Sequence, residues 1–172
     1  MRILLVEDNQ VNCFLLCDYL EFCGYSVQAI TASELFFFTL ELFKPNLILL
    51  DIKMPKIDGY TLLKEMQSQE RWRHIPVVVI SALSFRSHQE KALELGARRY
   101  IVKPIVPDIL KNIIEEELSH LGLECNGVEG HELGYESSAY SGKSITEKSA
   151  TGKSTVPSSI LTFDLGNNVQ VC

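Results

Sequence analysis

The stretch Leu47–Tyr60, LILLDIKMPKIDGY, sets an apolar run directly against a carboxylate. Four aliphatic residues end at Asp51, and a loop with Pro55 and the pair Asp58-Gly59 follows. A carboxylate at the end of a buried strand is costly unless it reaches solvent, a cation or strong hydrogen-bond donors. Asp51 is therefore either a strand-end residue that escapes into water or a residue placed there for chemistry.

Apolar runs and helix-period segments alternate on both sides of this stretch, up to about residue 120. This alternation favours an α/β domain with a parallel sheet covered by helices on both faces. Nearly continuous apolar strands fit such a sheet because its central strands are buried on both sides. The expected strands are Ile3–Val6, Tyr25–Ile30, Leu47–Leu50, Pro76–Ile80 and Tyr100–Val102, and the expected helices are about Gln10–Phe22, Ala32–Phe43, Tyr60–Gln69, Ser87–Leu95 and Pro107–His120.

Charged residues or a serine follow the first, third, fourth and fifth expected strands. Ligands of a parallel α/β sheet bind at the carboxyl ends of its strands, so the residues at these positions are the first candidates for a site. We expect three carboxylates, a hydroxyl and a lysine to meet at one edge of the sheet. They are Glu7 and Asp8 after the first strand, Asp51 after the third, Ser81 after the fourth, and Lys103 with Pro104 after the fifth.

Three neighbouring carboxylates repel one another and become tolerable when a hard divalent cation lies among them. Mg²⁺ prefers oxygen ligands and binds through one or two carboxylates together with phosphate oxygens. A lysine beside such a site suits a phosphoryl oxygen, and a serine hydroxyl can donate a hydrogen bond to another. Asp51 would then act as a nucleophile toward phosphorus, with the metal and Lys103 neutralising charge on the transferred group.

Each of these residues also has a purely structural explanation. Asp8-Asn9 and Ser81 are suitable helix caps. Asp51 suits a solvated strand end, and Lys103 and Pro104 suit a surface loop. Taken one at a time, these explanations stand beside the chemical one, but their joint occurrence at the strand ends of one sheet favours a site.

The chain contains the segments LLVEDNQVN, LILLDIKMPKIDGY, IPVVVISA and GARRYIVKPI. Together these four segments resemble the receiver domain of two-component response regulators, the CheY-like family. They occur in the family's order and with matching spacing over roughly residues 1–120, and "VEDNQVN" is common in stand-alone receivers and in receivers of hybrid kinases. The resemblance implies a flavodoxin-like (βα)5 three-layer fold with a parallel sheet of strand order 2-1-3-4-5.

The same resemblance implies a phosphoryl-accepting site at Asp51. The phosphoryl group would come from a phosphohistidine on a sensor histidine kinase or a histidine phosphotransfer protein. Glu7, Asp8 and Asp51, with the main-chain carbonyl of Lys53, would hold Mg²⁺ or another divalent cation such as Mn²⁺.

The family pattern further implies a switch beside the phosphoryl group. Ser81 stands where the family has a Thr or Ser that contacts this group, and Lys103 matches the lysine that pairs with it. The Lys103–Pro104 bond would be cis, which is affordable only before proline. Tyr100 matches the aromatic switch that turns inward when Ser81 is drawn to the phosphoryl group. Leu83, at a position that tunes dephosphorylation in the family, leaves the lifetime of the phosphoryl group open.

The expected function is that of a single-domain response regulator in a two-component system or phosphorelay. Phosphorylation would switch a protein-interaction face toward a downstream protein target. We expect no enzyme activity beyond the chain's own phosphorylation and dephosphorylation. The alternative is an interaction module with the same fold that is not switched by phosphate.

Composition limits the partners. The chain has 172 residues, a net charge of −6 and no basic run, which argues against nucleic-acid binding. No apolar stretch has the length of a membrane span and no signal peptide is apparent, so we expect a cytoplasmic protein. Residues 121–172 are rich in Ser, Thr and Gly, and we expect a largely disordered tail after a receiver domain of residues 1–120.

The apolar residues of the first two helices require a choice of buried face. On the first helix, the i, i+4 stripe predicts a core side made of Val11, Leu15, Tyr19 and Cys23. Cys17 would lie on the opposite face and Cys13 near its edge, both as exposed thiols in a reducing compartment. On the second helix, the consecutive residues Phe36–Phe38 cannot all face inward, so at least one should be exposed.

Overall fold

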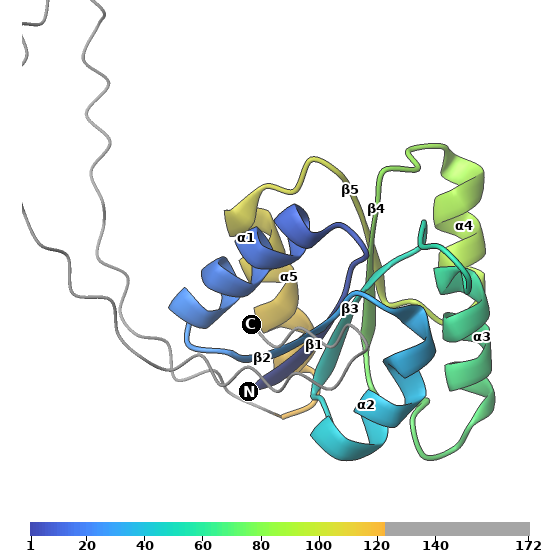
Figure 1. Ribbon diagram of the computed structural model, residues 1–172, viewed down its shortest axis with the longest axis horizontal. Coiled ribbons are helices and arrows are strands. Elements are labelled where there is room, and N and C mark those ends of the chain that lie inside the picture. The colour runs from blue at the N-terminus through green and yellow to red at the C-terminus, as the bar shows by residue number, and fades with distance from the viewer. Residues whose placement is uncertain (123–172) are drawn as a thin grey trace, which may run out of the picture.

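The computed structural model describes residues 1–122, in which a five-stranded sheet lies between two layers of helices (Figure 1). Each boundary lies within one residue of the predicted one, except that α2 begins four residues after the predicted helix start at Ala32. The strands are β1 (Arg2–Val6), β2 (Ser26–Ile30), β3 (Leu47–Asp51), β4 (Val77–Ser81) and β5 (Arg99–Val102), and the helices are α1 (Gln10–Phe22), the 3-10 helix η1 (Ser33–Leu35), α2 (Phe36–Phe43), α3 (Gly59–Ser68), α4 (Arg86–Glu94) and α5 (Pro107–Ser119).

All neighbouring strands are parallel and follow the order β2-β1-β3-β4-β5, which confirms the predicted flavodoxin-like fold. Every residue of β3 and β4 is buried, as the continuous apolar runs predict. In the register of the sheet, Asp51 pairs with Ile80, and Ser81 pairs with Val102. The carboxyl ends of the central strands are therefore nearly level, and the residues that follow them share one edge.

Helices cover both faces of the sheet (Figure 1). Helices α1 and α5 pack on one face, and α2, α3 and α4 pack on the other. Each layer has its own apolar core, because β-strand side chains alternate between the two faces. The first core includes Leu16, Leu20, Leu110 and Ile114, and the second includes Phe36, Leu40, Leu62, Met66 and Ala92.

The buried face of α1 differs from the predicted one. Cys13 and Cys17 are only 4% and 2% exposed, so the expectation of surface thiols is wrong, whereas Val11 and Leu15 are 67% and 60% exposed. The helix carries apolar residues on nearly all sides, so apolar spacing alone does not select the face that packs. The buried stripe, at spacings of three and four residues, is Cys13, Leu16, Cys17 and Leu20.

The segment predicted as one helix from Ala32 to Phe43 begins with the single turn η1 and continues as α2. Phe36 is fully buried and Phe38 is 65% exposed, which confirms that the three phenylalanines do not all face inward. The ring of Phe37 stacks on Trp72 with 5.1 Å between ring centroids.

A cluster of charges lies at the amino edge of the sheet, and we refer to Arg98, Arg99, Glu116 and Glu117 as the amino-edge cluster. The side chain of Glu117, near the end of α5, is 2% exposed. Its carboxylate lies 3.4 Å from Arg98 Nε and 3.2 Å from Arg99 Nη2. Arg99 Nη2 also lies 3.0 Å from Glu116 Oε1. Two guanidinium groups therefore balance two carboxylates and tie the start of β5 to the end of α5.

The predicted tail begins at the limit of the described residues. Leu121 and Gly122 follow α5, and residues 123–172, on which the expectation of disorder rests, lie outside the described part of the chain. Within residues 1–122, none of the helices combines the length and the apolar character that a membrane crossing requires.

Candidate functional site

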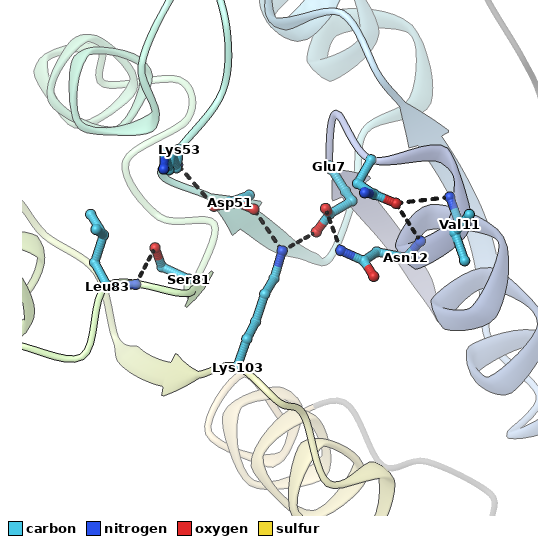
Figure 2. A network of polar contacts seen from close by, with 9 residues as sticks. Glu7, Val11, Asn12, Asp51, Lys53, Ser81, Leu83 and Lys103 are labelled. Carbon is cyan, nitrogen blue, oxygen red and sulfur yellow. Dashed lines mark hydrogen bonds and ion pairs between the residues drawn. The ribbon is translucent and has the colours of Figure 1, made fainter.

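Strand β3 brings Asp51 to the carboxyl edge of the sheet with its side chain almost completely buried (Figure 2). Asp51 Oδ1 accepts a hydrogen bond from the backbone N–H of Lys53 at 2.8 Å. Asp51 Oδ2 lies 2.6 Å from the ammonium nitrogen of Lys103. The carboxylate is thus held by a backbone donor and a cation rather than by escape into water.

Glu7 extends from the end of β1 toward the same lysine (Figure 2). Its side chain is 2% exposed, and Glu7 Oε2 lies 2.6 Å from Lys103 Nζ. Glu7 Oε1 accepts a hydrogen bond from Asn12 Nδ2 at 3.0 Å. Asn12 is not among the residues predicted for the site from the sequence. Its position one turn into a helix capped by Asn9, five residues after Glu7, is a signal that a search for carboxylate partners would have used.

Asp8 completes the group of three carboxylates. Oxygen atoms of Glu7, Asp8 and Asp51 all lie within 4.8 Å of one another. Asp8 is more exposed than the other two, and among the described residues no ion pair involves it. Glu7, Asp8, Asp51 and Lys103, which we call the carboxyl-edge cluster, therefore place three carboxylates against one ammonium group.

Lys103 is the cation of this cluster, and its side chain is 18% exposed. Burial by itself lowers the pKa of the Lys103 ammonium group, but the hydrogen bonds to Asp51 and Glu7 and the charges of these carboxylates outweigh burial and raise the pKa above 10.5. Lys103 is therefore charged at neutral pH. Its ammonium group lies between two carboxylates because the pocket strongly favours positive charge.

Ser81 and Tyr100 are connected through the backbone of Leu83. Ser81, at the end of β4, is fully buried, and its Oγ accepts a hydrogen bond from the Leu83 N–H at 3.3 Å (Figure 2). The hydroxyl of Tyr100 donates to the carbonyl oxygen of Leu83 at 2.7 Å. The peptide bond between Lys103 and Pro104 is cis, as the family resemblance implies. Ser81 and Tyr100 are thus connected through the backbone of one residue, Leu83.

The pair Asp58-Gly59 of the opening stretch is required by packing against β3. A Cβ atom on Gly59 would lie 2.4 Å from the carbonyl oxygen of Asp51 and 2.8 Å from the Cα of Ile52, which is too close for any side chain. Asp58 caps α3, since its side chain accepts the N–H of Thr61 at 3.1 Å. This close approach places the start of α3 against the end of the strand that carries Asp51.

The donor set of the carboxyl-edge cluster fits a hard divalent cation. Carboxylate oxygens are the ligands that Mg²⁺ and Mn²⁺ take, and here three of them lie together with only one ammonium group to balance them. Lys53 contacts Asp51 through its backbone N–H. The predicted role of the Lys53 carbonyl as a metal ligand remains a prediction.

The five-stranded parallel sheet in this order, with an acidic group and a lysine at its carboxyl edge, is the arrangement that the resemblance to two-component receiver domains implies. Residues 3–115 match the sequence model of the response regulator receiver domain, and the chain belongs to this family. Receiver domains are signalling modules that interact with histidine kinases and downstream targets, and not enzymes in the usual sense.

Named relatives share this assignment. The polar-differentiation response regulator DivK of Brucella ovis is 34% identical over 113 residues, which are 64% of this chain and 91% of DivK. The receiver domain of a signal transduction histidine kinase from Syntrophus aciditrophicus superposes with a TM-score of 0.65 at 30% identity, over 79% of this chain and 98% of that domain. The receiver domain of a sensor histidine kinase from Pseudomonas aeruginosa was solved with a magnesium ion in its active site cleft. It superposes with a TM-score of 0.64 at 30% identity, over 69% of this chain and 97% of that domain.

Proposed function

We propose that this chain is a phosphorylation-driven switch in which Asp51 accepts a phosphoryl group from a phosphohistidine of a partner protein in a reaction that requires Mg²⁺. The observation that carries the proposal is the burial of Asp51 in a cluster where three carboxylates face one lysine. Such an excess of buried negative charge is unfavourable unless a cation and a charge-bearing ligand use it.

Glu7, Asp8 and Asp51, with the carbonyl of Lys53, are the residues that would hold Mg²⁺ or Mn²⁺. When bound, the cation would neutralise charge on the phosphoryl oxygens during transfer. The Asp51 carboxylate attacks phosphorus, a phosphorus–oxygen bond forms, and the phosphorus–nitrogen bond to the donor imidazole breaks. Lys103 then exchanges its contact with Asp51 Oδ2 for one with a phosphoryl oxygen, for which an ammonium group is suited.

The new phosphoryl group would change the conformation through Ser81. Ser81 Oγ accepts from the Leu83 N–H in the present state, and a phosphoryl oxygen offers the hydroxyl a strong acceptor. Movement of this loop would also break the bond from Tyr100 to the Leu83 carbonyl and free the ring to turn inward. Moving such a switch from mostly off to mostly on takes roughly 5 kcal/mol of differential stabilisation. The face of α4, β5 and α5 would carry the output to a downstream protein.

The surface of α1 supports docking of the phosphoryl donor. Val11, Phe14 and Leu15 are each at least 60% exposed, which is unusual for neighbouring large apolar residues. A groove of about 410 Å³ runs between α1 and the start of α5, with Lys103 and Pro104 in its lining. A partner that packs its apolar side chains here would bring its phosphohistidine beside the carboxyl-edge cluster. We propose that this exchange takes place in the cytoplasm.

Phosphoramidate, a small donor with a phosphorus–nitrogen bond, tests the proposal. In the presence of Mg²⁺, intact-mass measurement of the full chain should show one added phosphoryl group, and addition should be lost in EDTA and in Asp51→Asn. Asp58→Asn is the matched control, because asparagine caps α3 as well as aspartate does. Absence of addition to the wild type, or equal addition to Asp51→Asn, contradicts the proposal and favours an interaction module that phosphate does not switch.

A further inference from the structure

The loop between Asp51 and α3 has a defined shape, and part of it is held from outside. Inside the loop, the N–H of Met54 donates to the Ile52 carbonyl at 3.1 Å, and the N–H of Gly59 donates to the same carbonyl at 2.9 Å. Lys56 adopts a left-handed conformation with φ of 67°. A lysine in this conformation is unfavourable and persists only when its surroundings fix it.

The contact that fixes this turn comes from Ser33 at the start of η1. Ser33 is 3% exposed, and its Oγ donates to the carbonyl of Pro55 at 3.2 Å and accepts the N–H of Ile57 at 3.3 Å. Its single proton has a second possible acceptor, Glu34 Oε2, at the longer distance of 3.4 Å. One buried hydroxyl thus bridges the residues on either side of Lys56.

An ion pair reinforces the same turn at the surface. Lys56 Nζ lies 2.5 Å from Glu34 Oε1, and the hydrogen bond from Lys56 lowers the pKa of the Glu34 carboxyl. Both side chains are largely exposed, so this pair alone contributes little. Ser33 is the buried and therefore the stronger part of the attachment.

We infer that Ser33 is a positioning residue for the cation site, an inference that rests on the proposed function. By holding Pro55 and Ile57, the Ser33 hydroxyl fixes the loop whose Lys53 peptide contacts Asp51. Ser33 touches none of the reacting groups. Without the hydroxyl, Lys56 is no longer held left-handed, the loop relaxes, and the Lys53 peptide loses its fixed place beside the carboxylates.

Magnesium affinity of the full chain, measured by calorimetric titration, tests this role. Ser33→Ala is expected to weaken Mg²⁺ binding about tenfold, the effect typical of losing a residue that supports a metal ligand. Ser33→Thr keeps the hydroxyl and should bind Mg²⁺ nearly as wild type does. Ser26→Ala, which removes an exposed hydroxyl from β2, is the control for a serine that does not reach the loop. A role in stability alone would lower the unfolding temperature of Ser33→Ala and leave its Mg²⁺ affinity unchanged, and that result overturns the inference.

Hydrogen exchange in the wild type provides a test that does not depend on a folded variant. Coupling between two sites is reciprocal, so Mg²⁺ bound at Asp51 must also tighten the contact at Ile57. Saturating Mg²⁺ should slow exchange of the Ile57 amide, and unchanged exchange overturns the inference. If the wild type binds no Mg²⁺ at all, the proposed function fails and the inference fails with it. If the wild type binds Mg²⁺ and Ser33→Ala binds it equally well, only the inference fails.

Discussion

The two edges of the parallel sheet both bury charged side chains, but the positive and negative charges balance at only one of them. At the carboxyl edge, Glu7 and Asp51 are 2% and 6% exposed, and both contact the one ammonium group of Lys103. At the amino edge, the buried Glu117 contacts two guanidinium groups, those of Arg98 and Arg99. Negative charge is in excess in the carboxyl-edge cluster, whereas charges balance in the amino-edge cluster.

This difference separates a structural cluster from a binding site. A buried charge that is balanced by its own neighbours needs no added counterion, and it serves to fix two elements together. A cluster with uncompensated charge raises the free energy of the folded protein until a counterion binds. Under the proposed function, a bound Mg²⁺ would restore stability that the carboxyl-edge cluster costs. The amino-edge cluster, whose charges balance, needs no added cation.

Loss of the Lys103 charge from the carboxyl-edge cluster should have the largest effect on the free energy of unfolding. Lys103→Met keeps the apolar stem and removes the charge, which leaves Glu7 and Asp51 buried without a cation. We expect the free energy of unfolding in EDTA to fall by about 3 kcal/mol, the usual cost of breaking a buried ion pair from one side. Urea denaturation measures this change, and added Mg²⁺ should reverse part of it because the cation binds only the folded state.

The matched control for Lys103→Met is Lys111→Met on α5. Lys111 forms an exposed i, i+4 pair with Glu115 at 3.8 Å, so its loss should cost no more than about 0.5 kcal/mol. Equal stability of Lys103→Met and the wild type in EDTA would show that negative charge is not in excess in the carboxyl-edge cluster. The two edges would then not differ in their charge balance.

Removal of the buried carboxylate from the amino-edge cluster should also lower the free energy of unfolding, but by less than Lys103→Met does. Glu117→Gln leaves Arg98 and Arg99 without their shared partner, but both guanidinium groups are more than one third exposed and regain water. We expect a loss of about 2 kcal/mol in urea denaturation, independent of Mg²⁺. Glu116→Gln, at an exposed carboxylate, is the control and should change stability far less. Rescue of Glu117→Gln by Mg²⁺ would contradict a purely structural role.

Neutralising a carboxylate of the carboxyl-edge cluster should raise the free energy of unfolding rather than lower it. Asp8→Asn removes the one carboxylate of that cluster that lacks an ion pair among residues 1–122, and with it the repulsion on Glu7 and Asp51. We expect a gain of about 1 kcal/mol in EDTA, as is common when a functional site is sacrificed. In saturating Mg²⁺ the gain should disappear, because the wild type recovers stability on binding and the variant binds weakly. A loss of stability in EDTA would refute the excess of negative charge.

The sequence predicts the carboxyl edge better than the amino edge, for a physical reason. Each carboxyl-edge residue directly follows an apolar strand, and parallel strands bring such residues together whatever the details of packing. Asp51, Ser81 and Lys103 could therefore be placed from strand positions alone. The contact of Arg98 and Arg99 with Glu117 depends on how α5 packs beside β5, which no strand pattern contains.

The buried face of α1 and the loop contact of Ser33 could not be predicted from the sequence, because both depend on tertiary packing. The helix α1 is apolar nearly all round, so the predicted stripe of Val11 and Leu15 and the true stripe of Cys13 and Cys17 fit equally well before packing is known. Ser33 lies far from Pro55 in the chain, and a lone serine before a helix is ordinarily a cap. Its contact with the loop forms only in the folded sheet, where the segments that follow β2 and β3 meet beyond the intervening strand β1.

Alkaline pH should separate the two edges without a change of covalent structure in the wild type. The pKa of Lys103 is raised above 10.5 in the folded protein because the hydrogen bonds and charges of Asp51 and Glu7 outweigh its burial. The stabilisation by Lys103 is therefore complete below pH 10.5 and is lost as the pH rises through the folded pKa. Arginine stays protonated over this range, so the amino-edge cluster keeps its cations. The stability difference between wild type and Lys103→Met should narrow above pH 10.5 in urea denaturation, while the difference between wild type and Glu117→Gln stays constant. If the stability differences for Lys103→Met and Glu117→Gln changed equally with pH, the two edges would not differ in the way their charges are compensated.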